Sequence, residues 1–251
     1  MISEKFSNGS SWAHQLDPRV KFILTIFFVF TIALGNQILM LGQGLIFAII
    51  LVITTSLNYK DIIKRLLVVN IFIALIWVFI PFTYKGKVIF NIWYFSASLE
   101  GLIYALKITL RANTIMLIII TFLSTSTISN LLHALNYFYL PNKLIYLFFF
   151  VYRYLHVIKD EFDTLYNAML IRGFKSETSL HTYKSYAYLI AVLLIRSYER
   201  SQKVYEAMLC RGFKGEFYII DDFNINRKDY IFIFIFSIVI IYFNTLEILI
   251  L

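Results

Sequence analysis

Two arginines, Arg172 and Arg211, stand in nearly the same twelve-residue context. Residues 166–177 read YNAMLIRGFKSE and residues 205–216 read YEAMLCRGFKGE, so nine of the twelve aligned positions are identical. An arginine is always charged, and its guanidinium forms paired hydrogen bonds with carboxylate or carbonyl oxygens, which makes its contacts directional. The chemistry expected of this pair is therefore recognition of a partner.

The repeat also has a purely structural interpretation. Apolar residues precede each arginine at the spacing of one helix face. Gly173 and Gly212 stand where a left-handed residue ends a helix, and a basic residue in the last turn interacts favourably with the helix dipole. Capping alone needs neither Ala-Met-Leu before the arginine nor Phe-Lys after the glycine. Two near-identical helix ends therefore suggest two equivalent receptors, such as the subunits of a dimer.

No other group of residues predicts catalysis or a metal centre. The four histidines have no partner at helical spacing and no nearby set of carboxylates. Cys210 is the single cysteine, and it replaces Ile171 of the first copy, which favours a packing position over a reactive thiol. The chain contains no Walker A pattern and no Gly-x-Ser-x-Gly. We expect a non-catalytic protein that binds no metal or cofactor itself.

The elements that position these arginines belong to an all-α integral membrane protein. Hydrophobic residues make up 60% of the 251 and charged residues only 15%, whereas soluble domains have nearer a quarter charged. A bilayer core of about 30 Å needs about 20 helical residues. We expect two spans within residues 22–59 around a turn at 35–37, a third at 66–82 ending at Pro81, a fourth within 99–132 and a fifth at 230–250. Lys107 and Arg111 share one face of the fourth span, so they must snorkel or face protein.

Charge separates a cytoplasmic region from these spans. Residues 142–223 carry most of the charge, and their apolar runs are shorter than a spanning helix requires; an extra span at 144–156 is the alternative. We expect a membrane region at 1–135 with about four spans, a coupling-helix region at 136–225 and the last span at 226–251. The net charge of +8 fits basic loops on the cytoplasmic side better than nucleic acid, which places the N-terminus inside the cell.

Several motifs in order resemble the transmembrane (T) component of energy-coupling factor transporters. Paired Ala-x-x-x-Arg-Gly motifs occur in the charged region, and HQLDPRVK at 14–21 resembles the Leu-Asp-Pro-Arg-x-Lys segment that precedes the family's first span. YRYLHVIKDEF at 152–162 and RSYERSQKVYEAMLCRGF at 196–213 resemble its cobalt-transport branch, the CbiQ type. The resemblance covers about residues 10–220.

The resemblance implies a role for each motif. In this family two ABC-type ATPase subunits, which hold ATP and Mg, dimerise beneath the T component, and an arginine ending each coupling helix enters a groove on one of them. Closing of the dimer would change the angle between the coupling helices and move a separate substrate-capture subunit in the membrane. The residues carried over are these: Arg172 and Arg211 as coupling residues, Ala168 and Ala207 for close helix approach, Gly173 and Gly212 to turn the chain, and Asp17, Pro18, Arg19 and Lys21 as the N-terminal motif.

The cargo and two other interpretations remain open from the sequence. The resemblance implies a protein of the plasma membrane and favours cobalt or nickel as the cargo. The metal would be bound by the capture subunit. A shared T component for vitamin uptake is the alternative. A non-transporting membrane scaffold that binds a cytoplasmic dimer is a third hypothesis. Asp17 with Pro18 at the first helical position is equally interpretable as a simple N-cap.

Overall fold

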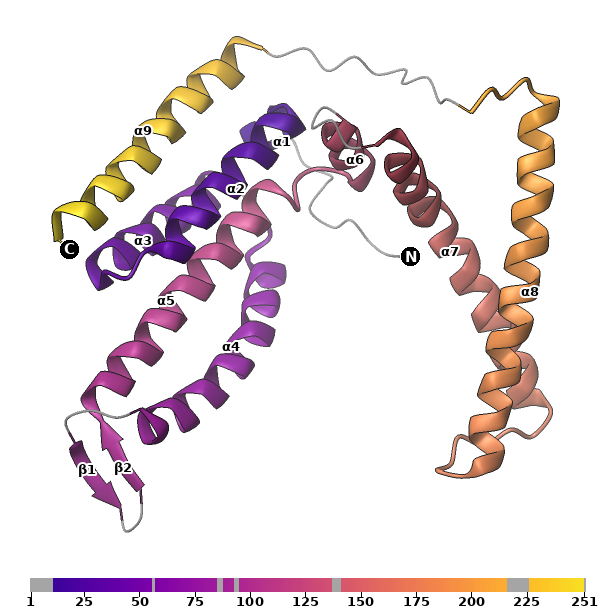
Figure 1. Ribbon diagram of the computed structural model, residues 1–251, viewed down its shortest axis with the longest axis horizontal. Coiled ribbons are helices and arrows are strands. Elements are labelled where there is room, and N and C mark those ends of the chain that lie inside the picture. Colours follow the sequence, from indigo (N-terminus) through magenta and orange to yellow (C-terminus); the bar gives the residue numbers. More distant parts are fainter. Residues whose placement is uncertain are drawn as a thin grey trace. The chain divides into compact units, whose positions relative to one another are not determined.

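Helices dominate the computed structural model, which describes residues 11–55, 57–84, 88–92, 95–136, 141–215 and 226–250. They are α1 (Trp12–Gln15), α2 (Pro18–Leu34), α3 (Ile38–Thr54), α4 (Tyr59–Thr83), α5 (Leu99–Phe122), α6 (Ile128–Asn136), α7 (Asn142–Ile171), α8 (Leu180–Cys210) and α9 (Arg227–Ile250), with a hairpin of β1 (Val88–Ile92) and β2 (Phe95–Ser98) (Figure 1). Contacts divide the chain into two compact units. We call α7 and α8 the paired-helix unit and the remaining elements the membrane unit.

The membrane unit contains the helices that cross the bilayer. By length and composition, α4, α5 and α9 are each long and apolar enough to span. The 17 residues of α2 and of α3 extend about 26 Å, at the lower end of the range for a spanning helix. The chain is an all-α integral membrane protein, as its composition predicts. The starts of α2 and α9 lie beside the end of α5, because Asp17 bonds to Asp229 and Lys21 bonds to Ser126. The start of α4 and the end of α3 lie at the same end of the unit. We call this the junction end and the opposite one the far end.

The observed bounds follow the predicted spans, except that the third span begins earlier than predicted and continues past its predicted end at Pro81 to Thr83. The turn at 35–37 between α2 and α3 is confirmed. Helix α4 begins at Tyr59 instead of residue 66, because the side chain of Asn58 accepts a hydrogen bond from the N–H of Lys60 at 3.3 Å and the polar first turns stay helical. The fourth span ends at Phe122, and a separate short helix, α6, begins at Ile128.

The small antiparallel hairpin between α4 and α5 was not predicted. Val88 pairs with Ser98, Ile92 pairs with Phe95, and an irregularity follows Val88. Its strand sequences VIFNI and FSAS contain the β-branched and aromatic residues that favour strands, which is the signal that could have found it.

Aromatic side chains fill the core of the membrane unit. Phe28 and Phe122 are fully buried and Phe236 is 1% exposed. The Phe236 ring lies 5.6 Å from that of Phe28 and 5.4 Å from that of Phe122, both in tilted or edge-on geometry. Such contacts add to the burial energy of the rings. They join α2, α5 and α9 into one core.

Polar side chains inside the membrane unit bind protein groups. Asn70 on α4 and Asn113 on α5 exchange amide hydrogen bonds of 3.0 and 3.2 Å. At the far end, Nη2 of Arg111 donates to the carbonyl oxygen of Gly35 at 2.5 Å, and Glu247 accepts from the N–H of Asn36 at 2.8 Å. Arg111 therefore faces protein, one of the two environments predicted for it.

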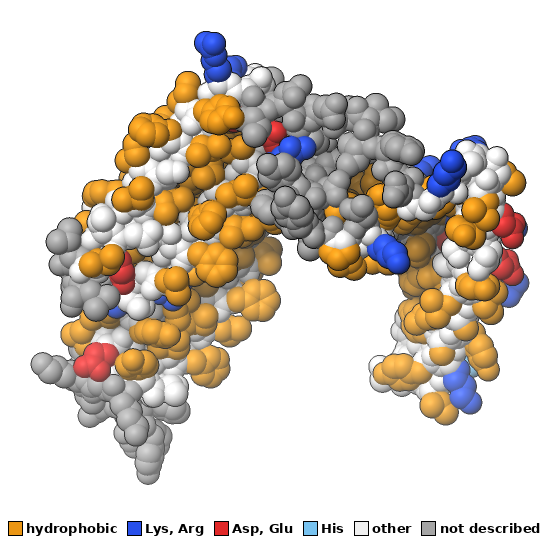
Figure 2. Space-filling view, turned by 45° about the horizontal axis from the view of Figure 1, so that its top comes forward, with side chains coloured by type: hydrophobic (Ala, Val, Ile, Leu, Met, Phe, Trp, Pro, Cys, Tyr) orange, Lys and Arg blue, Asp and Glu red, His pale blue; other side chains and the backbone are white. Residues whose placement is uncertain are grey.

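The outer surface of the membrane unit is apolar. Hydrophobic side chains spread over its visible face in Figure 2. The exposed residues of α4 include Leu67, Ile71, Phe72, Leu75, Val78 and Phe79, each more than half exposed. A surface of this kind suits lipid or another membrane protein.

The paired-helix unit consists of two long helices that cross (Figure 1). Helix α7 has 30 residues and runs without a break through residues 144–156, where an extra span was the alternative. Helix α8 has 31 residues and begins at the N-cap Ser179, whose side chain accepts from the N–H of Thr182 at 3.2 Å. Charged residues are distributed along both helices, and neither is among the described helices that are apolar enough to span.

Candidate functional site

Both repeated helix ends have the same hydrogen-bonded geometry. At the end of α7, the N–H of Gly173 donates to the carbonyl three residues earlier at 3.0 Å, and that of Phe174 donates five residues back at 3.1 Å. At the end of α8, Gly212 and Phe213 make the equivalent bonds at 2.9 and 3.1 Å. The two glycines have φ of +85° and +79°. This is the Schellman arrangement, and the left-handed glycine predicted at each helix end is confirmed.

Arg172 and Arg211 stand at equivalent positions of these two ends. Each is the last residue before the left-handed glycine, with φ and ψ near −80° and 8° for the first and −89° and 9° for the second. Both side chains are exposed. Ile171 is 87% exposed and Cys210 is also exposed, so the packing position expected for Cys210 is wrong within this chain. Each arginine is thus presented beside an uncovered neighbour.

A cluster of charges marks the place where α7 and α8 cross. Glu161 on α7 forms ion pairs with Arg196, a very short contact, and with Arg200 at 3.6 Å. The repeat spacing of 39 residues makes Glu161 the counterpart of Arg200. Two equivalent positions therefore meet at the crossing, which is where an approximate two-fold relation between the helices requires them to meet.

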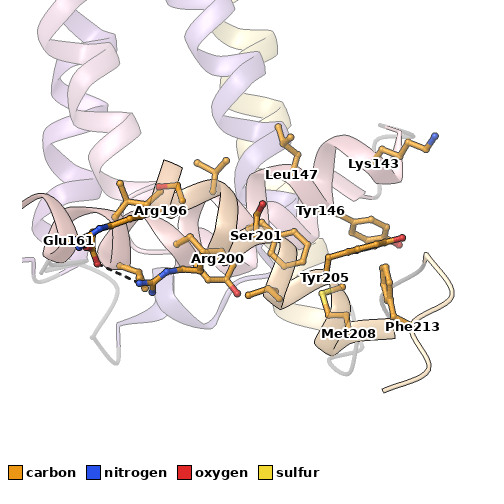
Figure 3. Close-up of a pocket in the computed structure, with 17 residues that line it drawn as sticks. Lys143, Tyr146, Leu147, Glu161, Arg196, Arg200, Ser201, Tyr205, Met208 and Phe213 are labelled. Carbon is orange, nitrogen blue, oxygen red and sulfur yellow. Dashed lines mark hydrogen bonds and ion pairs between the residues drawn. The ribbon is translucent and has the colours of Figure 1, made fainter. Parts of the chain in front are cut away.

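A groove lies on each side of this crossing. The first, with a cavity of about 560 Å³, is formed by the N-terminal part of α7 and the C-terminal part of α8; its residues include Tyr146, Tyr154, Tyr205, Met208 and Phe213. In Figure 3, Arg196 and Arg200 reach Glu161 at one end of this groove, and Phe213 lies at the other. The second, of about 590 Å³, combines the C-terminal part of α7 with the N-terminal part of α8 and includes Arg172. The two arginines consequently lie toward opposite ends of the helix pair.

The loop after α7 is held by a network that the second copy does not share. The hydroxyl of Ser176 lies 3.4 Å from that of Tyr166 and 3.1 Å from that of Tyr186. The rings of Tyr166 and Tyr186 stack with centroids 6.4 Å apart, and Phe174 meets Tyr186 edge-on. In the second copy Gly215, with φ of +91°, replaces Ser176. The two ends share their caps and arginines and differ in the loop that follows.

Comparison with known proteins identifies the family. Residues 9–219 match the CbiQ family, described as cobalt transport protein. The chain belongs to this family. The energy-coupling factor transporter transmembrane protein EcfT of Bacillus subtilis is 28% identical over 217 residues, 81% of each chain. EcfT of Ruminiclostridium cellulolyticum is 27% identical over 209 residues, covering 78% of this chain and 77% of its own. An uncharacterised protein of Methanocaldococcus jannaschii is 28% identical over 243 residues, or 94% and 83%.

These matches confirm the resemblance drawn from the motifs. The chain is a CbiQ/EcfT-type transmembrane component of the energy-coupling factor transporter family. Among the described residues of this CbiQ-family chain, no group of three or more His, Cys, Asp or Glu side chains is placed to hold a metal ion. Ala168 and Ala207 are exposed, so the close helix approach implied for them stays a prediction about a partner.

The N-terminal motif of this CbiQ-family chain lies far from the repeated ends along the sequence and is largely buried. Oδ1 of Asp17 accepts from the N–H of Arg19 at 2.8 Å, and Pro18 is the first residue of α2, so the N-cap interpretation is confirmed. Lys21 is only 1% exposed, and its Nζ donates to Oγ of Ser126 at 3.1 Å.

Sequence reasoning missed two partners of this motif, Ser126 and Asp229. Asp229 is 1% exposed, and its Oδ1 accepts from the N–H of Asp17 at 3.0 Å. The two residues are 212 positions apart, so no local pattern links them. An acidic residue in the first turn of the last helix was the available signal, since it favours a capping role.

Proposed function

We propose that this chain couples ATP hydrolysis by a cytoplasmic ATPase dimer to solute uptake across the plasma membrane. The observation that carries the proposal is the pair of exposed arginines on matching Schellman ends, directed by a helix pair whose equivalent positions Glu161 and Arg200 meet at the crossing. A receptor with two-fold symmetry offers two copies of one groove, and a pair of matching ends at opposite sides of a crossing can occupy both.

Each arginine would dock into one ATPase subunit, and ATP and Mg would be held by those subunits. Guanidinium groups bind carboxylate or carbonyl oxygens in a fixed geometry, so a movement of the ATPase surface would be transmitted to the helix end. The Schellman turn supports this, because its two hydrogen bonds fix the backbone directly after each arginine, and glycine permits the left-handed conformation that these bonds require. A change in the crossing angle of α7 and α8 is the expected response.

A separate membrane subunit would capture the cargo. The paired-helix unit carries exposed apolar residues, among them Phe148, Val151, Tyr188, Leu194 and Ile195, which supports contact with a capture subunit or lipid. The description of the matching family as cobalt transport protein supports Co²⁺ as cargo, with Ni²⁺ as the near chemical neighbour. Uptake of several vitamins through different capture subunits is the alternative that the experiment on cargo decides.

The orientation belongs to the same proposal. Basic residues gather toward the junction end, including Arg19, Lys60, Lys64, Arg65, Arg227 and Lys228. Lysines and arginines favour the cytoplasmic side. The junction end, the N-terminus and the paired-helix unit would therefore face the cytoplasm, and the far end would face outward.

The test is the double variant Arg172→Ala with Arg211→Ala, studied in the complex purified from native membrane and reconstituted in liposomes. We expect the variant to insert normally and to lose ATP-driven uptake by about tenfold or more, because two charge-assisted contacts are removed together. Each single variant should lose less. Uptake of Co²⁺ or Ni²⁺ at the wild-type rate in the double variant would refute the coupling role.

Cargo is tested by identifying the capture subunit that copurifies. A partner with a metal-binding N-terminus would support cobalt or nickel as the cargo. Recovery of several vitamin-binding partners would reject the metal and support vitamins as the cargo. A wild-type complex that shows no nucleotide-dependent uptake would favour the non-transporting scaffold.

A further inference from the structure

Two connections join the paired-helix unit to the membrane unit. On the membrane side of each connection, described residues are bound to the start of α2. The first connection follows α5 and α6, and the second leads into α9. On the membrane side, the first is preceded by α6 and, before α6, by the turn that contains Ser126, and the second is followed by Asn226 and Asp229. A displacement of the paired-helix unit that is transmitted along the chain reaches the spans through these segments.

Lys21 holds the first of these segments. Its Nζ donates to Oγ of Ser126, and both residues are buried, at 1% and 7% exposure. Ser126 lies in the turn between α5 and α6. The same turn receives a bond from α4, where Nη1 of Arg65 donates to Oγ of Ser124 at 3.0 Å. The turn is therefore fastened to two spans besides its own.

Asp229 holds the second segment. Its Oδ1 accepts from the N–H of Asp17 at 3.0 Å and its Oδ2 accepts from the N–H of Asn226 at 2.8 Å. One carboxylate thus caps the start of α9 and binds the N-cap residue of α2. Each oxygen accepts one of the two bonds, so an amide in the same position would turn its NH2 group toward one of the two N–H donors.

Charge holds these two contacts together. Asp17 is 6% exposed, and both Asp17 and Asp229 attract Lys21 electrostatically. Oδ2 of Asp17 is buried and accepts no hydrogen bond from the part of the chain that the structure describes. Moving Lys21 away would remove a positive charge from beside two buried carboxylates, which is unfavourable. The contacts resist separation under load.

We propose that Asp17, Lys21, Ser126 and Asp229, the junction cluster, form the joint that transmits movement of the paired-helix unit to the spans. They are positioning residues for the transport cycle, and the inference rests on the proposed function. The cluster makes the starts of α2 and α9 and the end of α5 move as one body.

The experiment compares two hydroxyl deletions one residue apart, in the complete complex reconstituted in liposomes. Ser126→Ala removes the acceptor of Lys21. Thr125→Val removes a hydroxyl that is 3% exposed and bonds to the carbonyls of Thr121 and Phe122 on its own helix end. For Ser126→Ala we expect bound ATPase subunits, continued ATP hydrolysis, and uptake per ATP lowered by about threefold to tenfold. Thr125→Val should keep the wild-type ratio, and Ser126→Thr, which retains the hydroxyl, should restore it.

Three results would overturn the inference. The first is an unchanged ratio of uptake to ATP hydrolysed in Ser126→Ala. The second is a fall of this ratio in Thr125→Val as large as that in Ser126→Ala. The third is loss of the ATPase subunits from the Ser126→Ala complex. The proposed function fails separately, when Arg172→Ala with Arg211→Ala transports normally. If the double variant loses uptake and Ser126→Ala couples normally, the proposed function is supported and the proposed joint is rejected.

Discussion

Ile171 and Cys210 occupy matching places immediately before the two arginines, and both are exposed. The arginine beside each of them is proposed to enter a groove on a partner. We therefore expect Ile171 and Cys210 to be covered in the assembled complex. Cys210 is the single cysteine of the chain, which makes the second end chemically distinguishable from the first.

We predict that a membrane-impermeant maleimide alkylates Cys210 readily in the isolated chain in detergent. In the complex with its ATPase subunits the rate should fall by about tenfold or more, because residues inside an interface are shielded from water. Peptide mass spectrometry of the fragment containing Cys210 measures the rate. Arg211→Ala should restore fast alkylation, whereas Arg172→Ala, acting at the opposite end, should leave Cys210 protected. Equal rates in the isolated chain and in the complex would exclude docking at this end.

Among the helices, α4 and α5 meet at a close approach that depends on Gly101. A Cβ there would lie 2.9 Å from Cα of Pro81 and 3.0 Å from the carbonyl oxygen of Ile80. Both neighbours are backbone atoms of the last turns of α4, so they cannot swing aside. The N–H of Gly101 is also held by Oγ of Ser98 at 3.1 Å. The far ends of the two helices are therefore fixed against each other.

We predict that Gly101→Ala destabilises the protein by about 1–3 kcal/mol, as overpacking does. The matched control is Gly42→Ala in α3, where an added Cβ meets nothing within 4 Å. That change should stabilise by about 0.5–1 kcal/mol, since alanine loses less backbone freedom in a helix. Thermal unfolding in detergent, followed by tryptophan fluorescence, gives the two shifts. Shifts of the same sign would show that the close approach at Gly101 is not rigid.

Sequence reasoning works for these elements where a signal is local. The apolar runs predict the spans, and a glycine after a basic residue predicts each left-handed helix end, because both depend on neighbouring residues. The burial of Lys21 was missed, since its partners Ser126 and Asp229 are distant in the chain. The crossing at Glu161 was missed for the same reason: its ion pairs with Arg196 and Arg200 need the tertiary fold.

For the whole molecule, the proposed orientation places Cys210 inside the cell. We predict that an impermeant maleimide labels Cys210 in inverted membrane vesicles when the chain is expressed without its ATPase subunits, and fails to label it in intact cells. The matched control is Cys210→Ser with Thr83→Cys, because Thr83 is an exposed residue at the far end of α4. This variant should label in intact cells. Labelling of Cys210 in intact cells would show that the orientation is the opposite one. The basic residues would then lie outside, against their usual preference for the cytoplasmic side.

The unequal loops after α7 and α8 bear on how the two ends are attached to the helix pair. The first loop is braced by Ser176 between two tyrosine hydroxyls, whereas Gly215 stands at the corresponding place of the second. The Ser176 hydroxyl links Tyr166 on α7 to Tyr186 on α8, so the first end is tied to both helices. Gly215 has no side chain that could form the same tie at the second end. Two identical ATPase subunits would therefore bind two ends that differ in how they are attached to the helix pair.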